Sequence, residues 1–255
     1  MDSDAGVYHG SVAHTWDSMQ GEFGDAYRRE TIHPFISSLL DALGARAFID
    51  LGSGNGCTLR YMERFGVDRL VGVEASPELV ELARGYGGPK SRSAYVCGDM
   101  SSVSVLARSA VLCQGSGPIL AASLFGVQDC SDLGGFFASL RAILTPADSL
   151  LLVFEDPAGM LAGDHKYALR SGAHVTSDGR TVQFVEWLGS GVHYGRGEGG
   201  VRNRIVTHLR TVEEYVSAAV DAGFKLRDCP IPHPASSKFN FLFFSVWPAP
   251  SGPAS

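Results

Sequence analysis

The sequence contains no run of lysines or arginines, and its formal net charge is −6. Proteins that bind nucleic acids usually carry a basic stripe, so the composition argues against a nucleic acid as substrate or partner. No apolar stretch is long enough to span a bilayer, and the acidic N-terminus lacks the basic and apolar regions of a signal peptide. We therefore expect a cytoplasmic protein that does not enter a membrane.

Cysteines are also scarce, and their spacing argues against a disulfide framework and against a zinc site. There are five, an odd number, and no two of them form a CxxC pair. A disulfide framework and a zinc site both need closer and more regular spacing. Histidines are similarly scattered, so we expect no metal site, although aspartates alone could hold a magnesium ion. The sequence is compatible with a homo-oligomer, but no residue pattern in it indicates one.

Apolar strands alternate with amphipathic helices along the chain. The expected strands cover residues 47–51, 70–74, 93–97, 119–125 and 150–154, with two more ending near Leu226 and spanning Phe239–Trp247. The expected helices include 57–65, one that begins at Ser76-Pro77-Glu78, and 133–144. This order predicts an α/β fold with a doubly wound, mostly parallel seven-stranded sheet.

The same reading divides the chain into five parts. We expect an N-terminal helical arm or lid at 1–45, a cofactor-binding core at 46–155, an acceptor-binding insertion at 156–210, a C-terminal part of the core at 211–247, and a flexible tail at 248–255. The insertion contains two β-like runs, Thr181–Leu188 and Arg202–Leu209. An insertion of this length in a compact domain is usually a lid or a binding element.

A glycine turn follows the first strand, with the sequence D-L-G-S-G-N-G at residues 50–56. Its G-x-G-x-G spacing differs from the G-x-G-x-x-G of dinucleotide sites, which opposes an NAD-dependent oxidoreductase. Glu74 ends the second strand, where a carboxylate can accept hydrogen bonds from ribose hydroxyls. Asp99 ends the third strand, where it can meet an adenine amino group, and Met100 can cover the ring.

Residues 46–154 resemble the core of class I S-adenosylmethionine-dependent methyltransferases, small-molecule or natural-product (antibiotic biosynthesis) branch. The matching stretches are F-I-D-L-G-S-G-N-G at 48–56, V-G-V-E-A-S-P at 71–77, C-G-D-M at 97–100 and A-I-L-T-P at 142–146. The resemblance implies a Rossmann-like methyltransferase fold, methyl transfer and S-adenosyl-L-methionine as cofactor. It places Gly52 and Gly54 against the methionine part, Glu74 on the ribose and Asp99 on the adenine. Further cofactor contacts are expected from Asp50, Ser53, Ala75, Met100 and Ser123.

Two departures from this family's pattern stand in the core. The fourth strand lacks an acidic residue that often occurs there, and Pro146-Ala147-Asp148 replaces a common Pro-Gly-Gly before the fifth strand. Neither departure removes a group that we expect to touch the cofactor.

The arm and the insertion supply the candidates for the acceptor side. Tyr8 and Trp16 resemble the aromatic residues that fold over the cofactor in small-molecule methyltransferases, and Arg28 or Arg29, of which we select Arg29 for the site, could pair with the cofactor carboxylate. The fourth strand lacks the N-P-P-Y type of motif of nucleic-acid amino-methyltransferases, which favours a small acceptor. For the catalytic site we select His165, Tyr167, Tyr8 and Phe125.

These features predict an N-methyltransferase of a small metabolite or natural-product intermediate. A small-molecule O-methyltransferase is the alternative, for which His165 is the first candidate base. A non-catalytic protein that only binds S-adenosylmethionine is the second alternative. A protein or RNA methyltransferase also stays open.

Overall fold

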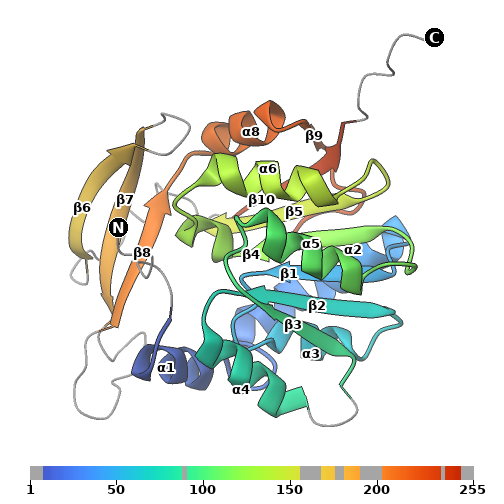
Figure 1. Cartoon of the computed structure of the whole chain (residues 1–255), viewed down its shortest axis with the longest axis horizontal. Coiled ribbons are helices and arrows are strands. Elements are labelled where there is room, and N and C mark those ends of the chain that lie inside the picture. The colour runs from blue at the N-terminus through green and yellow to red at the C-terminus, as the bar shows by residue number, and fades with distance from the viewer. Residues whose placement is uncertain are drawn as a thin grey trace.

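Seven strands form the central sheet, in the spatial order β3-β2-β1-β4-β5-β10-β9 (Figure 1). All run in the same direction except β10, which is antiparallel to both of its neighbours. The strands are β1 Ala47–Leu51, β2 Arg69–Glu74, β3 Ser93–Cys97, β4 Ile119–Leu124, β5 Ser149–Glu155, β9 Phe224–Arg227 and β10 Phe239–Val246. This is the doubly wound, mostly parallel seven-stranded sheet that the sequence predicts, with the topology of the Rossmann-like methyltransferase fold.

The computed structural model describes residues 8–87, 91–155, 168–175, 181–189, 203–236 and 239–247. Its helical segments are α1 Ser11–Gln20, η1 Arg28–Ile32, α2 His33–Leu43, α3 Cys57–Met62, α4 Pro77–Gly87, α5 Val103–Leu112, η2 Gly126–Asp129, α6 Leu133–Ile143 and α8 Val212–Asp221. Of these, η1 is a single π-helical turn and η2 a 3₁₀ turn. The alternation of strands and helices predicts a helix between the third and fourth strands without giving its bounds, and α5 is that helix.

Two apolar layers cover the sheet, one on each face. On one face α5, α6 and α8 pack against alternate residues of the strands, and on the other face α2 and α3 do so. Strand β5 is buried from Ser149 to Phe154 because both of its faces are covered, which is why it reads as a continuous apolar run. With both faces covered, a ligand can approach the sheet at the ends of its strands. In α/β proteins ligands bind at the carboxyl ends of the parallel strands.

A separate antiparallel sheet of three strands lies beside this edge, on the same side of the molecule as α1 (Figure 1). Its strands are β6 Ala168–Val175, β7 Thr181–Gly189 and β8 Asn203–Leu209, and β8 lies against η2. The two expected β-like runs are confirmed as β7 and β8, whereas β6 was not expected. His165 and Tyr167 lie outside the described residues.

Residues with known preferences for helix ends flank three of the helices. Gly44 ends α2 in the left-handed conformation, and the Ser76 hydroxyl accepts a hydrogen bond from Leu79 N at the start of α4. Thr211 and Glu214 form the reciprocal capping box of α8.

The second departure from the family's pattern has a structural reason. Asp148, which stands where a glycine is common, is buried, and its carboxylate accepts from the backbone N–H groups of Ile119 and Thr145, each at 2.7 Å. Asp148 therefore joins the start of β4 to the turn before β5.

All five cysteines are free thiols, as expected. Within the described ranges, no cluster of three or more His, Cys, Asp or Glu side chains is arranged to hold a metal ion. In the same part of the chain, no helix combines the length and the apolarity that a membrane crossing requires.

Candidate active site

The glycine turn after β1 depends on backbone conformations that other residues rarely adopt. Gly52, Gly54 and Gly56 have φ angles of +78°, +55° and +75°. Gly56 is also sterically required, because a Cβ atom there would lie 2.2 Å from the hydroxyl of Tyr95. The early third glycine of the G-x-G-x-G pattern is thus explained by the packing of β3 beneath the turn.

Glu74 connects the end of β2 to this turn. Its two carboxylate oxygens accept hydrogen bonds from the backbone N–H groups of Gly54, at 2.8 Å, and Ser76, at 2.9 Å. Burial raises the pKa of the Glu74 carboxyl, and these backbone hydrogen bonds oppose that rise. The Ala75 N–H also bonds to this carboxylate. A carboxylate offers about four acceptor positions, so Glu74 can still accept a hydrogen bond from a ligand that lies on the turn.

Asp50, within β1, is a second buried acid beside the turn. Its side chain is 2% exposed, and its Oδ1 atom is buried without a hydrogen-bond partner. Burial raises the pKa of Asp50 to about 7, against the lowering effect of the Arg28 charge. The hydroxyl of Ser53 is likewise buried without a partner. Buried polar atoms are normally hydrogen-bonded, so these two mark places for a polar ligand.

The remaining predicted cofactor residues differ in what they offer a ligand. Asp99 is exposed at the end of β3, and its Oδ1 accepts from Ser101 N at 2.7 Å and from the Ser101 hydroxyl at 2.8 Å. Met100 is half-buried against the core, and Ala75 is half-buried beside Glu74. Ser123 is fully buried, and its hydroxyl donates to the Leu51 carbonyl at 3.0 Å, so it braces β1 against β4.

The N-terminal arm lies directly on the turn. The Nε1 atom of Trp16 would be 3.1 Å from a Cβ atom on Gly54, so the missing side chain of Gly54 lets the indole approach. The ring of Tyr8 lies 5.3 Å from the ring of Trp16, and its carbonyl accepts a hydrogen bond from the Ser76 hydroxyl. The arm therefore contacts Gly54 and Ser76, the two residues whose N–H groups bond to Glu74.

Of the two candidate arginines in the arm, the structure places Arg28 at the site. Its guanidinium lies 5.7 Å from the ring centre of Trp16 and 5.0 Å from that of Phe125, and it forms an ion pair with Asp25. Arg29, which we selected from the sequence, is exposed and donates to the Gly24 carbonyl. Arg28 therefore replaces Arg29 as the candidate partner of a carboxylate.

Phe125 directly follows β4 and has a φ angle of +71°. This left-handed conformation is uncommon for an aromatic residue, and such outliers concentrate at functional sites. Its ring packs edge-on against Phe239 at 5.1 Å, and Phe239 packs against Tyr27 at 4.7 Å. We call Tyr27, Phe125 and Phe239 the aromatic wall. The sequence did not single out Phe239 or give Tyr27 a role.

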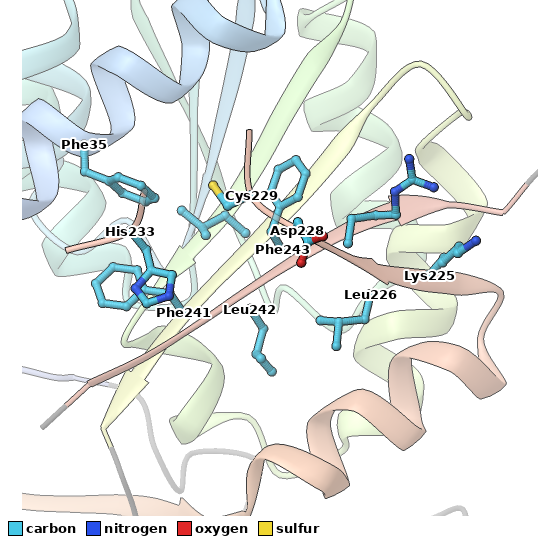
Figure 2. A pocket seen from close by; sticks show the side chains of 11 residues that line it. Phe35, Lys225, Leu226, Asp228, Cys229, His233, Phe241, Leu242 and Phe243 are labelled. Carbon is cyan, nitrogen blue, oxygen red and sulfur yellow. The ribbon is translucent and has the colours of Figure 1, made fainter. Parts of the chain in front are cut away.

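One hollow of about 610 Å³ lies elsewhere, over β9 and β10 (Figure 2). Phe35, Cys229 and Phe243 line it, and the ring of His233 stacks on Phe241 at 5.6 Å. No residue of the glycine turn lines it. This hollow is separate from the site described above.

Comparison with known proteins agrees with this geometry. Residues 49–114, from β1 to beyond the end of α5, match a family described as a methyltransferase domain. The matched residues form a methyltransferase domain, and they include the glycine turn, Glu74 and Asp99. No curated protein matches it.

Solved structures of methyltransferases share the enzyme's fold over nearly the whole chain. The methyltransferase CcbJ from Streptomyces caelestis is 18% identical, with a TM-score of 0.62 over 95% of this chain and 98% of its own. An S-adenosylmethionine-dependent methyltransferase from Clostridium acetobutylicum is 11% identical, with a TM-score of 0.59 over 92% and 97%. DesVI from Streptomyces venezuelae is 21% identical, with a TM-score of 0.53 over 95% and 100%.

The residues at the turn fit S-adenosylmethionine, the cofactor that the family resemblance implies. The unpartnered oxygens of Asp50 and Ser53 suit the polar methionine end, while the remaining acceptor position of Glu74 suits a ribose hydroxyl. The glycines leave the space that a ligand lying against the backbone needs.

Proposed function

We propose that the enzyme methylates a nitrogen atom of a small polar metabolite or natural-product intermediate. The observation that carries the proposal is the aromatic wall at the end of β4, beside the cofactor turn. When bound, S-adenosylmethionine supplies a methyl group that is already activated, so the protein must mainly align the two reactants and exclude water. Aromatic side chains with few polar groups are suited to that task.

The acid–base properties of the nearby residues favour nitrogen over oxygen. Burial raises the pKa of Tyr27 above its usual 10, so this phenol stays protonated at neutral pH and is a poor base. His33 is fully buried against Thr58 and Tyr61, and burial lowers its pKa to about 4. A neutral amine attacks the methyl carbon with its own lone pair, as the carbon–sulfur bond breaks toward sulfur, and loses its proton afterwards. It needs no strong base, whereas a hydroxyl does.

The cofactor side of the proposal assigns a role to each polar group. Glu74 accepts hydrogen bonds from the ribose hydroxyls, and Asp99 accepts one from the adenine amino group. Asp50 receives the amino group of the methionine part, and Arg28 faces its carboxylate. Gly52 and Gly54 allow the backbone to approach the ligand closely.

The arm and the insertion complete the acceptor site in this proposal. The arm covers the turn with Trp16 and Tyr8, and the sheet β6–β8 lies beside the same edge. The net charge of −6 supports a small acceptor over a nucleic acid. His165 and Tyr167 remain candidate acceptor contacts in the insertion.

Mass spectrometry after incubation with methyl-labelled cofactor and a panel of amines, phenols and sugars tests the proposal. We expect label on an amine nitrogen. Label only on oxygen would instead support an O-methyltransferase, with His165→Ala as the next variant to assay. Cofactor binding without turnover on any member of a broad panel would support the binding-protein alternative, and one defined site on a macromolecule would refute a small acceptor.

A further inference from the structure

Asn55 is the one polar side chain of the glycine turn that points to the arm. Its Nδ2 atom donates to Asp17 Oδ1 at 2.8 Å and to the Gly21 carbonyl at 2.9 Å. Its Oδ1 atom accepts from Cys57 N at 3.2 Å, and the side chain is 1% exposed. All the polar atoms of this amide are therefore used to join the turn to α1 and to the start of α3.

Asp17 is held from a second direction. Its other oxygen accepts a hydrogen bond from the Tyr86 hydroxyl of α4 at 3.2 Å. The Arg60 guanidinium lies 4.2 Å from the Tyr86 ring, and its Nε donates to the Glu22 carbonyl at 2.7 Å. We call Asn55, Asp17, Tyr86 and Arg60 the latch, because together they fix the C-terminal half of α1 to three other elements.

The latch lies next to the residues that bind the cofactor. Trp16, which contacts Gly54, immediately precedes Asp17, so a bond that fixes Asp17 also fixes the indole on the turn. With the arm in this position Asp50, Ser53 and Glu74 are 2%, 6% and 7% exposed. Because the arm contacts Gly54 and Ser76 beside these groups, we expect a ligand that reaches them to displace the arm.

We propose that Asn55 is a positioning residue that holds the arm closed over the cofactor site and so limits the rate of cofactor exchange. Asn55 acts through Asp17 and Trp16 and has no contact of its own with the cofactor in this proposal. The idea depends on cofactor binding at the glycine turn and is independent of the identity of the acceptor.

The experiment measures the rate at which S-adenosylhomocysteine leaves the full-length enzyme, by stopped-flow displacement. Losing a hydrogen bond to a charged group corresponds to about a tenfold change or more, so Asn55→Ala and Asp17→Ala should each accelerate release by that factor. Because both substitutions break the same contact, the double variant should release little faster than the faster single variant. Asp68→Ala, which removes an exposed ion pair with Arg46, is the control and should release at the wild-type rate.

A charge exchange separates positioning from a general loss of stability. Asn55→Asp places a carboxylate against Asp17, so release should be fast at pH 8 and slower near pH 5, where carboxyl groups begin to take up protons. Adding Asp17→Asn to it restores the hydrogen bond between positions 55 and 17 but not the bond to the Gly21 carbonyl, so the rate should return part of the way to the wild-type value. Wild-type release rates in folded Asn55→Ala and Asn55→Asp would overturn the proposal, as would a double exchange that stays as fast as Asn55→Asp.

Discussion

Replacing Asp50 by asparagine should change how the stability of the enzyme depends on pH. The pKa of Asp50 is raised from 3.8 to about 7 because the carboxylate loses its hydration in the buried strand. The folded protein therefore holds this proton more tightly than the unfolded chain does, between pH 4 and pH 7. Over that interval the free energy of unfolding falls as pH rises, by about 1.4 kcal/mol per pH unit and about 4 kcal/mol in all.

An asparagine at position 50 has no proton to lose, so its variant should lack this slope. Compared with the wild type, Asp50→Asn should become progressively more stable from pH 5 to pH 7, and the difference should level off above pH 7. Urea unfolding at half-unit steps of pH, without cofactor, measures it. Asp68→Asn, at an exposed position, is the control. Parallel curves for the wild type and Asp50→Asn would refute a buried, proton-holding Asp50.

Cofactor binding should have the opposite pH dependence. If the Asp50 carboxylate receives the amino group of the cofactor, the wild type must lose the Asp50 proton before it binds. Its affinity for S-adenosylhomocysteine should then fall by about tenfold per pH unit below pH 7. Calorimetry at pH 6 and pH 8 checks this. In Asp50→Asn the affinity should be lower and nearly independent of pH, and an unchanged affinity would remove Asp50 from the cofactor site.

Three further substitutions test other parts of the site. Gly56→Ala should lower the free energy of unfolding by about 2–4 kcal/mol in urea, because its Cβ atom clashes with Tyr95 and its φ is positive. Gly115→Ala is the control, with a φ of +79° and open space around it, and should lower that free energy by only about 1–2 kcal/mol. Equal losses in the two variants would refute the clash. Arg28→Met should weaken cofactor binding at least tenfold and Arg29→Met less than twofold by calorimetry, and the reverse order would restore Arg29 as the carboxylate partner. Phe125→Ala should lower turnover more than tenfold while cofactor affinity stays within twofold; a matching loss in Phe241→Ala, in the separate hollow, would refute a specific wall.

The sequence predicts the sheet and the donor side of the site because their signals are local. Strand–helix alternation and the handedness of parallel connections determine the order of β1 to β5. Glu74 and the glycine turn could be found because each lies at the end of a strand, and such ends meet at one edge.

Positions that depend on tertiary contacts were not predicted. The π-helical turn Arg28–Ile32 pairs residues five apart instead of four, which shifts the helix phase and changes which arginine faces the site. Phe239 reaches the wall only because β10 runs antiparallel and begins at the edge where the other strands end. The role of Asn55 could not be predicted from its place in the turn, because it depends on hydrogen bonds to Asp17 and Gly21 of the distant arm.

The donor and acceptor sides are held at a fixed separation by the contact between two glycines. A Cβ atom on Gly126 would be 3.2 Å from the Cα atom of Gly52 and 3.0 Å from the Leu51 carbonyl oxygen, so the loop after β4 packs directly on the cofactor turn. The Ser123 hydroxyl bonds to that same carbonyl from β4. Phe125 lies between these two anchors in the chain, and its left-handed backbone is stabilised by both neighbours. Since methyl transfer depends on alignment more than on acid–base chemistry, this contact is where the fold contributes most directly to the reaction.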